Sequence, residues 1–328
     1  MSSVEVNYLN LKLKNPIIVA SSGLTKSADK VKACEDAGAG AVVLKSLFEE
    51  VLARKNIKDT YELYDHPEVY EYLNANMGLV YGSSEYCRVI EDSKKATSIP
   101  VIASINCISA NWWYEYAKQI EDSGADAIEL NIFSTATSRL QTSDEMERMY
   151  FEILANVKSK VKIPVAVKIG KYFSSLPNFV SNLEINGANG VVMFNRFTEP
   201  DIDIDTFTFK PAFSMSTKEE MYLPLRWIAI VHRQVKLSLA ASTGVKTYED
   251  VIKLVLAGAS AVQIASVIYT EGLPVIRKML DGIDNWMKNH QIENLSDLKG
   301  SLSFVETSKG VANHYLRAQF IEKISDIE

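Results

Sequence analysis

The chain has 328 residues, of which 47% are hydrophobic and 23% are charged, a balance typical of a globular protein with at least one large core. Its net charge of -6 argues against nucleic acid or an anionic membrane as a partner. No apolar run reaches the roughly 18 residues that a membrane span needs, so we expect no such segment. Three scattered cysteines and four isolated histidines predict a cytoplasmic protein without disulfides and without a metal site.

In chain order, the first predicted strand is Ile17–Ala20, and a predicted helix follows at 27–37. A sequence motif follows that occurs four times in the chain, Gly-Ala-x-(Ala or Gly)-(Val or Ile)-x-(Leu, Met or Ile). Each copy starts with a glycine that can end a helix and continues as a short apolar run, which is typical of a buried strand. The copies predict the second, fourth, sixth and eighth strands of a parallel sheet, at 38–44, 124–130, 187–193 and 258–264.

A second motif, Ile-Pro-Val, alternates with the Gly-Ala motif and predicts the third, fifth and seventh strands. It occurs at 99–101 and 163–165, and more loosely at 235–239. Eight strand–helix units predict a closed (β/α)8 TIM barrel, one domain over residues 1–328. An open dinucleotide-binding sheet usually carries Gly-x-Gly-x-x-Gly after its first strand, and the sequence has none. The other predicted helices lie at 86–97, 112–123, 143–160, 176–186, 225–234 and 247–257.

Three segments interrupt this alternation. Residues 46–84 are long for a connection and predict an insertion at the barrel mouth. At 198–214, aspartates alternate with apolar residues, which predicts a β-hairpin with one solvated face. A calcium site is the weaker interpretation of these aspartates, which are Asp201, Asp203 and Asp205. The tail from 296 to 328 is predicted to be helical.

Polar residues follow several predicted strands, and a barrel brings these strand ends together at one mouth. Lys45 and Lys168 close two strands, where a buried lysine is costly unless an electron-rich ligand receives it. Asn131 and Asn195 close two others, and their amides suit a flat heterocycle with alternating donors and acceptors. The simpler alternatives are surface lysines and loop-capping asparagines.

Small residues after the last two strands predict a phosphate site. They are Ala241–Val245 after the seventh strand and Ala265-Ser266 after the eighth. Ordinary helix capping by Ser242 and Ser266 explains the same residues equally well. Ser134 lies in a hydroxyl-rich loop and is a candidate proton acceptor, with a flexible turn as the default interpretation.

From about Val4 to Met287 the chain resembles the dihydroorotate dehydrogenase family. The order and spacing of several short motifs carry this assignment together. The motifs are Asn15–Ser21, Leu44-Lys45-Ser46, Asn76–Leu79, Glu129-Leu130-Asn131, Val165–Lys168 and Gly258–Ile264.

The resemblance implies a barrel that binds FMN and oxidises dihydroorotate by hydride transfer to flavin N5, while a base removes a proton from C5. Ser134 aligns with the family's base, and Lys45 is expected to reach both flavin and substrate. Lys168 is placed beside the N1–O2 edge, where it stabilises negative charge on reduced flavin. Soluble relatives are usually dimers, so the resemblance also implies a homodimer.

The remaining site residues follow from the same resemblance. The implied cofactor set is Ala20, Ser21, Lys45, Asn131, Lys168, Asn195, Ser242, Thr243, Gly244, Ala265 and Ser266. The implied set for a pyrimidine-like substrate is Lys45, Asn76, Met77, Gly78, Leu79, Asn131 and Asn195.

The chain departs from the family pattern mainly around the substrate. Ala136 stands where the family has a substrate-binding asparagine, and Arg196 where it has Ser or Thr. Each lost ligand costs about 1–3 kcal/mol of binding. Two hypotheses follow: an oxidoreductase acting on dihydroorotate or a related cyclic amide, and a catalytically inactive or repurposed FMN-binding relative. A phosphate-binding lyase or isomerase barrel is a third.

Overall fold

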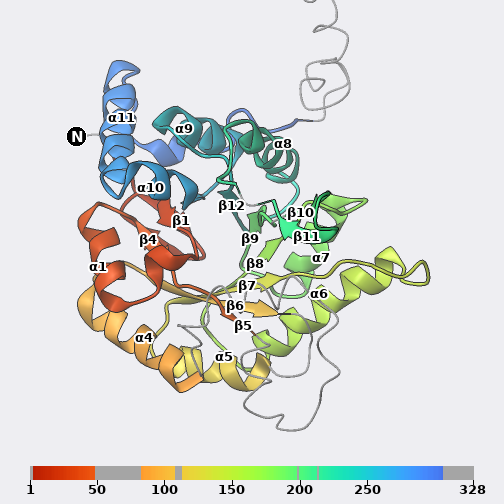
Figure 1. Cartoon of the computed structure of the whole chain (residues 1–328). Coiled ribbons are helices and arrows are strands. Elements are labelled where there is room, and N and C mark those ends of the chain that lie inside the picture. Colours follow the sequence, from red (N-terminus) through yellow and green to blue (C-terminus); the bar gives the residue numbers. More distant parts are fainter. Residues whose placement is uncertain (1–2, 49–82, 108–112, 198, 213, 306–328) are drawn as a thin grey trace, which may run out of the picture.

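The computed structural model describes residues 3–48, 83–107, 113–197, 199–212 and 214–305, and its centre is a closed parallel barrel (Figure 1). Neighbouring strands pair in the order β4-β3-β13-β12-β9-β8-β7-β6, and a pairing of β4 with β6 closes the ring. The predicted (β/α)8 TIM barrel is therefore confirmed. Its strands are β3 (Ile17–Val19), β4 (Ala41–Val43), β6 (Val101–Cys107), β7 (Ala127–Ile132), β8 (Val165–Ile169), β9 (Gly190–Met193), β12 (Ser238–Ser242) and β13 (Ala261–Ile264).

Helices surround the barrel and cover its outer face (Figure 1). The helix α7, for example, buries Leu176, Phe179, Val180 and Leu183, the spacing of one helix face. The helices are α1 (Ala28–Asp36), α4 (Ser83–Ala96), α5 (Trp113–Asp122), α6 (Ser143–Lys158), α7 (Leu176–Ile185), α8 (Tyr222–Val231), α9 (Tyr248–Ala257), α10 (Ser266–Glu271) and α11 (Pro274–Asn289).

The seventh strand lies later in the chain than the sequence predicted. Residues 235–239 were expected to form it, but β12 begins at Ser238 and the preceding helix α8 begins at Tyr222. The Glu184 carboxylate explains the difference, because its Oε1 accepts hydrogen bonds from the backbone N–H groups of Lys236 at 2.7 Å and Leu237 at 3.0 Å. These two residues therefore precede the ladder, and a side chain satisfies their N–H groups instead of a neighbouring strand.

The same glutamate cap occurs at three strand entries. Glu121 accepts hydrogen bonds from the N–H groups of Lys162 and Ile163, just before β8, and Glu35 accepts one from Ser98, before β6. Each of these glutamates stands three residues before the glycine of a Gly-Ala motif. In the first three copies the repeated motif therefore extends back into the preceding helix, and its glutamate binds the backbone at the entry of the next strand; the fourth copy has Val255 at this position.

An antiparallel hairpin closes the amino-terminal end of the barrel. Its strands are β1 (Val6–Tyr8) and β2 (Leu11–Leu13), and its buried side chains Tyr8, Leu9 and Leu13 form an inner cluster with barrel residues. The barrel contributes small side chains to this cluster, which leave room for the hairpin: Ala41, Ala127, Ala166, Ala240 and Ala261. Apart from the buried Tyr8 hydroxyl the base is filled by apolar groups, so the other polar interior positions lie toward the carboxyl ends of the strands.

The interrupting segments are partly described. After β4 the chain forms β5 (Leu47–Phe48), which pairs with β6, and residues 49–82 lie outside the described residues, so the rest of the insertion expected at 46–84 does too. The tail includes a short 3-10 helix at Leu295–Leu298, and its part beyond residue 305 also lies outside.

An antiparallel hairpin occupies the segment where the alternating aspartates predicted one. Its strands are β10 (Pro200–Asp203) and β11 (Thr208–Pro211). The Lys210 ammonium lies 3.6 Å from a carboxylate oxygen of Asp201 and 3.8 Å from one of Asp203. The Asp203 carboxylate also accepts the N–H of Asp205 in the turn. A lysine between the aspartates fits a solvated hairpin face and does not fit a calcium site.

Candidate functional site

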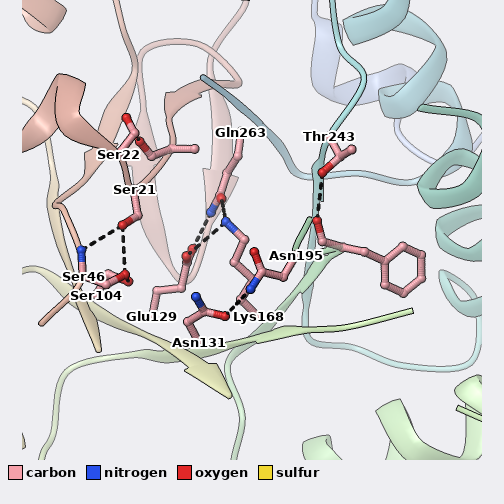
Figure 2. A network of polar contacts seen from close by, with 12 residues as sticks. Ser21, Ser22, Ser46, Ser104, Glu129, Asn131, Lys168, Asn195, Thr243 and Gln263 are labelled. Atoms are coloured by element: carbon pink, nitrogen blue, oxygen red, sulfur yellow. Dashed lines mark hydrogen bonds and ion pairs between the residues drawn. The ribbon is translucent and has the colours of Figure 1, made fainter. Parts of the chain in front are cut away.

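Three buried polar side chains meet inside the barrel, above the apolar base (Figure 2). Glu129 on β7 is 1% exposed, Lys168 on β8 is 6% exposed and Gln263 on β13 is 1% exposed. The Lys168 ammonium donates to Gln263 Oε1 at 3.0 Å and lies 3.6 Å from Glu129 Oε1. The Gln263 amide nitrogen donates to Glu129 Oε2. The predicted lysine therefore points inward, and a carboxylate and an amide fix its position.

Two asparagines pair just above this cluster. Asn131 stands in register with Lys168 across β7 and β8, and it lies two residues beyond Glu129, on the same face of its strand. Asn195 follows β9, and its backbone N–H donates to Ile169 O at 2.8 Å. The Asn195 amide donates to Asn131 Oδ1 at 2.7 Å. This bond uses one of the two donors of Asn195 and leaves the Asn131 amide group as a further donor set for a ligand.

A row of hydroxyl groups lines the opposite side, between β3, the residues after β4, and β6 (Figure 2). Ser46 Oγ lies 3.0 Å from Ser21 Oγ and 2.8 Å from Ser104 Oγ. The Tyr86 hydroxyl from α4 both accepts the Ser104 N–H and donates to Ser104 O. Ala20 begins this segment, and its N–H donates to Ile264 O at 2.9 Å. The row holds the Ala20-Ser21 turn rigidly against the barrel.

Lys45 lies between β4 and β5 and is half-buried. Burial and the nearby positive charge of Lys26 lower the pKa of Lys45. Both causes disfavour the ammonium in the free protein, so a ligand with negative or electron-rich groups stabilises it.

The residues between β12 and α9 form a tight turn. Thr243 and Gly244 both have positive φ values, 82° and 80°, a conformation that costs little for glycine but is strained for threonine. The Thr243 hydroxyl donates to Phe194 O at 3.1 Å and holds this turn against the end of β9. A Cβ on Gly244 would lie 2.3 Å from Met221 N, so only glycine fits there.

The second half of the predicted phosphate site starts at β13. Ala265 follows this strand, and Ser266 is the first residue of α10. The Ser266 hydroxyl accepts the N–H of Ser216 at 3.3 Å, which ties this turn to the segment before α8. One expectation was wrong: Ala241 and Ser242 belong to β12 and do not follow it, because the strand starts and ends later than predicted.

Ser134 and Ala136 lie in the loop between β7 and α6. Ser134 is half-buried and Ala136 is exposed. No described residue makes a hydrogen bond with the Ser134 side chain, whereas the next part of the loop is held locally by Gln141 Oε1, which accepts the N–H groups of Thr137 and Ser138. Nothing described here raises the basicity of Ser134, which a general base requires.

Arg196 follows Asn195 but does not extend the asparagine pair. Its guanidinium donates to Glu220 Oε1 at 2.8 Å, to Ser214 O at 2.6 Å and to Ser214 Oγ at 3.0 Å. These contacts clamp the exit of the hairpin to the short 3-10 helix Glu219–Met221. The arginine therefore acts as a structural tie in this structure.

Four site residues were not predicted from the sequence: Ser46, Ser104, Glu129 and Gln263. Two of them could have been found from the sequence, because Glu129 and Gln263 are single polar residues within predicted strands that are otherwise apolar. The predicted substrate residues Asn76, Met77, Gly78 and Leu79 lie outside the described residues. Among the described helices, none is both long and apolar enough to cross a lipid bilayer.

The family model described as dihydroorotate dehydrogenase matches residues 3–287. The chain belongs to the dihydroorotate dehydrogenase family. A relative from Pyrococcus abyssi, the catalytic subunit of dihydroorotate dehydrogenase B (NAD(+)), is 29% identical over 310 residues, which cover 90% of this chain and 98% of the relative. The subunit of the same name from Thermoplasma volcanium is 26% identical over 311 residues, 92% and 98% of the two chains.

A relative from Aeropyrum pernix carries the designation dihydroorotate dehydrogenase A (fumarate). It is 26% identical over 308 residues, which cover 90% of this chain and 96% of the relative. The resemblance therefore extends over almost the full length of these relatives.

Proposed function

We propose that this protein is an FMN-dependent oxidoreductase that oxidises dihydroorotate or a related cyclic amide. One observation carries the proposal: Lys168 points into the barrel from the β8 position in register with Asn131, the partner of Asn195 at the mouth of the barrel. A fixed cation next to paired amides suits a flat heterocycle that gains negative charge when it is reduced.

The residues at the mouth fit FMN on the chemistry of their donors. Ser242, Thr243, Gly244, Ala265 and Ser266 would hold the phosphate, in turns where the Gly244 position has no room for a Cβ. Ala20 and Ser21 offer a small, rigid surface for the ring system, and Lys168, Asn131 and Asn195 offer polar partners for its edge. When bound, FMN supplies a hydride acceptor at its N5 atom.

The substrate side follows from the same arrangement. Lys45 is the candidate for an electron-rich group of the substrate, because burial and Lys26 destabilise its charge until such a group arrives. Ser134 is the candidate for holding the proton that leaves the substrate, and it is half-buried at the same mouth. A serine hydroxyl that takes this proton must pass its own proton on, and a bound water that leads to solvent is the acceptor that fits.

We also propose a homodimer in the cytoplasm. The dimer rests on the family resemblance, and sedimentation of the purified protein measures it directly. The location rests on cysteine usage, since Cys34 and Cys87 are free thiols.

The proposed reaction is tested by adding dihydroorotate to the FMN-loaded protein without oxygen. We expect the absorbance of oxidised flavin to disappear, more slowly in Ser134→Ala and at an unchanged rate in Thr135→Ala, an exposed neighbour in the same loop. Flavin that stays oxidised at millimolar dihydroorotate contradicts this substrate and supports a repurposed FMN-binding protein.

A further inference from the structure

We infer that Glu129 and Gln263 are positioning residues for Lys168, and that the Glu129 carboxylate limits how strongly the Lys168 ammonium favours reduced flavin. This inference rests on the proposed function, because it concerns the flavin that Lys168 would meet. It adds two residues of the barrel interior to the determinants of the flavin's reduction potential.

The three side chains form a closed set of contacts from three different strands. Lys168 donates to Gln263 Oε1 at 3.0 Å, Gln263 donates to Glu129 Oε2, and Glu129 Oε1 lies 3.6 Å from the ammonium. The Gln263 amide therefore faces a cation with its oxygen and an anion with its nitrogen, and only one orientation of the amide satisfies both. All three side chains are at least nine-tenths buried, so water competes little for these contacts.

The strand register places the carboxylate on the base side of the lysine. Lys168 pairs with Asn131, whereas Glu129 pairs with Ala166, which is one inward-facing layer closer to the base. The carboxylate thus contacts the ammonium from the side of the hairpin β1–β2 at the base of the barrel, whereas the Asn131–Asn195 pair lies on the side of the mouth. A ligand at the mouth meets a cation whose charge is already partly balanced from below.

The sign of the effect follows from the charges. Reduction adds negative charge to the flavin, which the Lys168 ammonium attracts and the Glu129 carboxylate repels. Replacing Glu129 by glutamine removes the repulsion and keeps the size of the side chain and its bond to Gln263. The flavin itself then becomes the balancing charge for Lys168, so its reduced form is favoured.

The test is the two-electron reduction potential of the FMN-loaded Glu129→Gln protein, measured against reference dyes without oxygen. We expect the equilibrium to shift toward reduced flavin by about tenfold, which equals about 30 mV for a two-electron couple. Glu129→Asp withdraws the charge by one methylene group and should give a smaller rise in the same direction. Glu152→Gln, an exposed glutamate on α6, is the matched control and should leave the potential unchanged.

The outcomes separate this inference from the proposed function. If the wild-type protein takes up no FMN, the proposed function fails and this inference fails with it. If the wild-type protein takes up FMN but neither Glu129 variant raises the potential, only the inference is overturned. If Glu129→Gln does not fold, Glu129→Asp decides alone, and a potential equal to or below that of the wild type overturns the inference.

Discussion

The two sides of the barrel mouth are built in different ways. On the side proposed for the flavin, side chains such as Lys168 and Ser104 start from strands, are buried, and are fixed by hydrogen bonds to residues far away in the sequence. On the side proposed for the substrate, Ser134 and Ala136 lie in a loop whose nearest hydrogen bonds are local. Strand positions are tied to the whole barrel, whereas a loop can change without disturbing it. The departure from the family pattern at Ala136 falls in this loop, whereas Arg196 lies after β9 and is bonded to Ser214 and Glu220.

Among the variants that test the difference between the two sides of the mouth, we expect the largest loss of stability and of FMN binding at Gly244. Gly244→Ala combines a left-handed backbone with a Cβ only 2.3 Å from Met221 N, so we expect about 3 kcal/mol of lost stability and loss of FMN binding. Gly187→Ala is the matched control, because its φ is also positive, at 95°, while its Cβ would meet only Lys158 at 3.6 Å. We expect about 1 kcal/mol there, measured by urea unfolding. Equal losses in both variants would contradict a tight phosphate turn.

The buried hydroxyl row gives the next largest effect. Tyr86→Phe leaves the N–H and C=O groups of Ser104 without their side-chain partner, so we expect about 2 kcal/mol of lost stability. Tyr172→Phe is the control, since this tyrosine is 73% exposed and its change should cost less than about 0.5 kcal/mol. Thermal and urea unfolding of both variants measure the difference. An unaffected Tyr86→Phe protein would mean that the Tyr86 hydroxyl does not help to hold β6 at Ser104.

The loop side is tested by restoring a side chain. Ala136→Asn returns the amide that the family uses for its substrate, so we expect dihydroorotate to bind about ten to a hundred times more tightly. Because Ala136 is exposed, the change should leave the unfolding free energy within about 0.5 kcal/mol of the wild type. Titration of the FMN-loaded protein measures the affinity. An unchanged affinity would show that the loop holds the substrate by other groups, or does not reach it.

The glutamate caps give the smallest effect and a defined pH dependence. Burial raises the pKa of Glu35, but hydrogen bonds from Lys32 and Ser98 outweigh it and lower the pKa from 4.5 to about 2. A folded-state pKa below the unfolded value means that this stabilisation is complete above pH 4.5 and is lost as the pH falls toward 2. Glu35→Gln should therefore cost about 1 kcal/mol at pH 7 and progressively less in acid.

The control for this cap is Asp36→Asn. Asp36 also pairs with Lys32, at 3.0 Å, but its carboxylate is 63% exposed and caps no strand entry. Its loss should change stability little at any pH. Urea unfolding between pH 3 and pH 7 compares the two variants, and equal pH profiles would show that the backbone cap contributes nothing.

The positions of most barrel strands were predictable from the sequence, because glycines and apolar runs mark every strand except the seventh, β12. The seventh strand was misplaced since Val235 and Leu237 are apolar and pack against the core, yet their segment is capped by Glu184 and lies outside the ladder. No local pattern distinguishes such a residue from a strand residue. The Glu129–Gln263 contact was missed for a related reason: it joins residues 134 positions apart, and only the closed barrel brings them together.

The central claim is that the rigid side of the mouth holds FMN, and flavin content of the purified protein tests it most directly. We expect a yellow protein that releases one FMN per chain on unfolding, or an apoprotein that takes up one FMN per chain and loses this capacity in Gly244→Ala. A colourless protein that remains colourless after incubation with excess FMN would contradict the account.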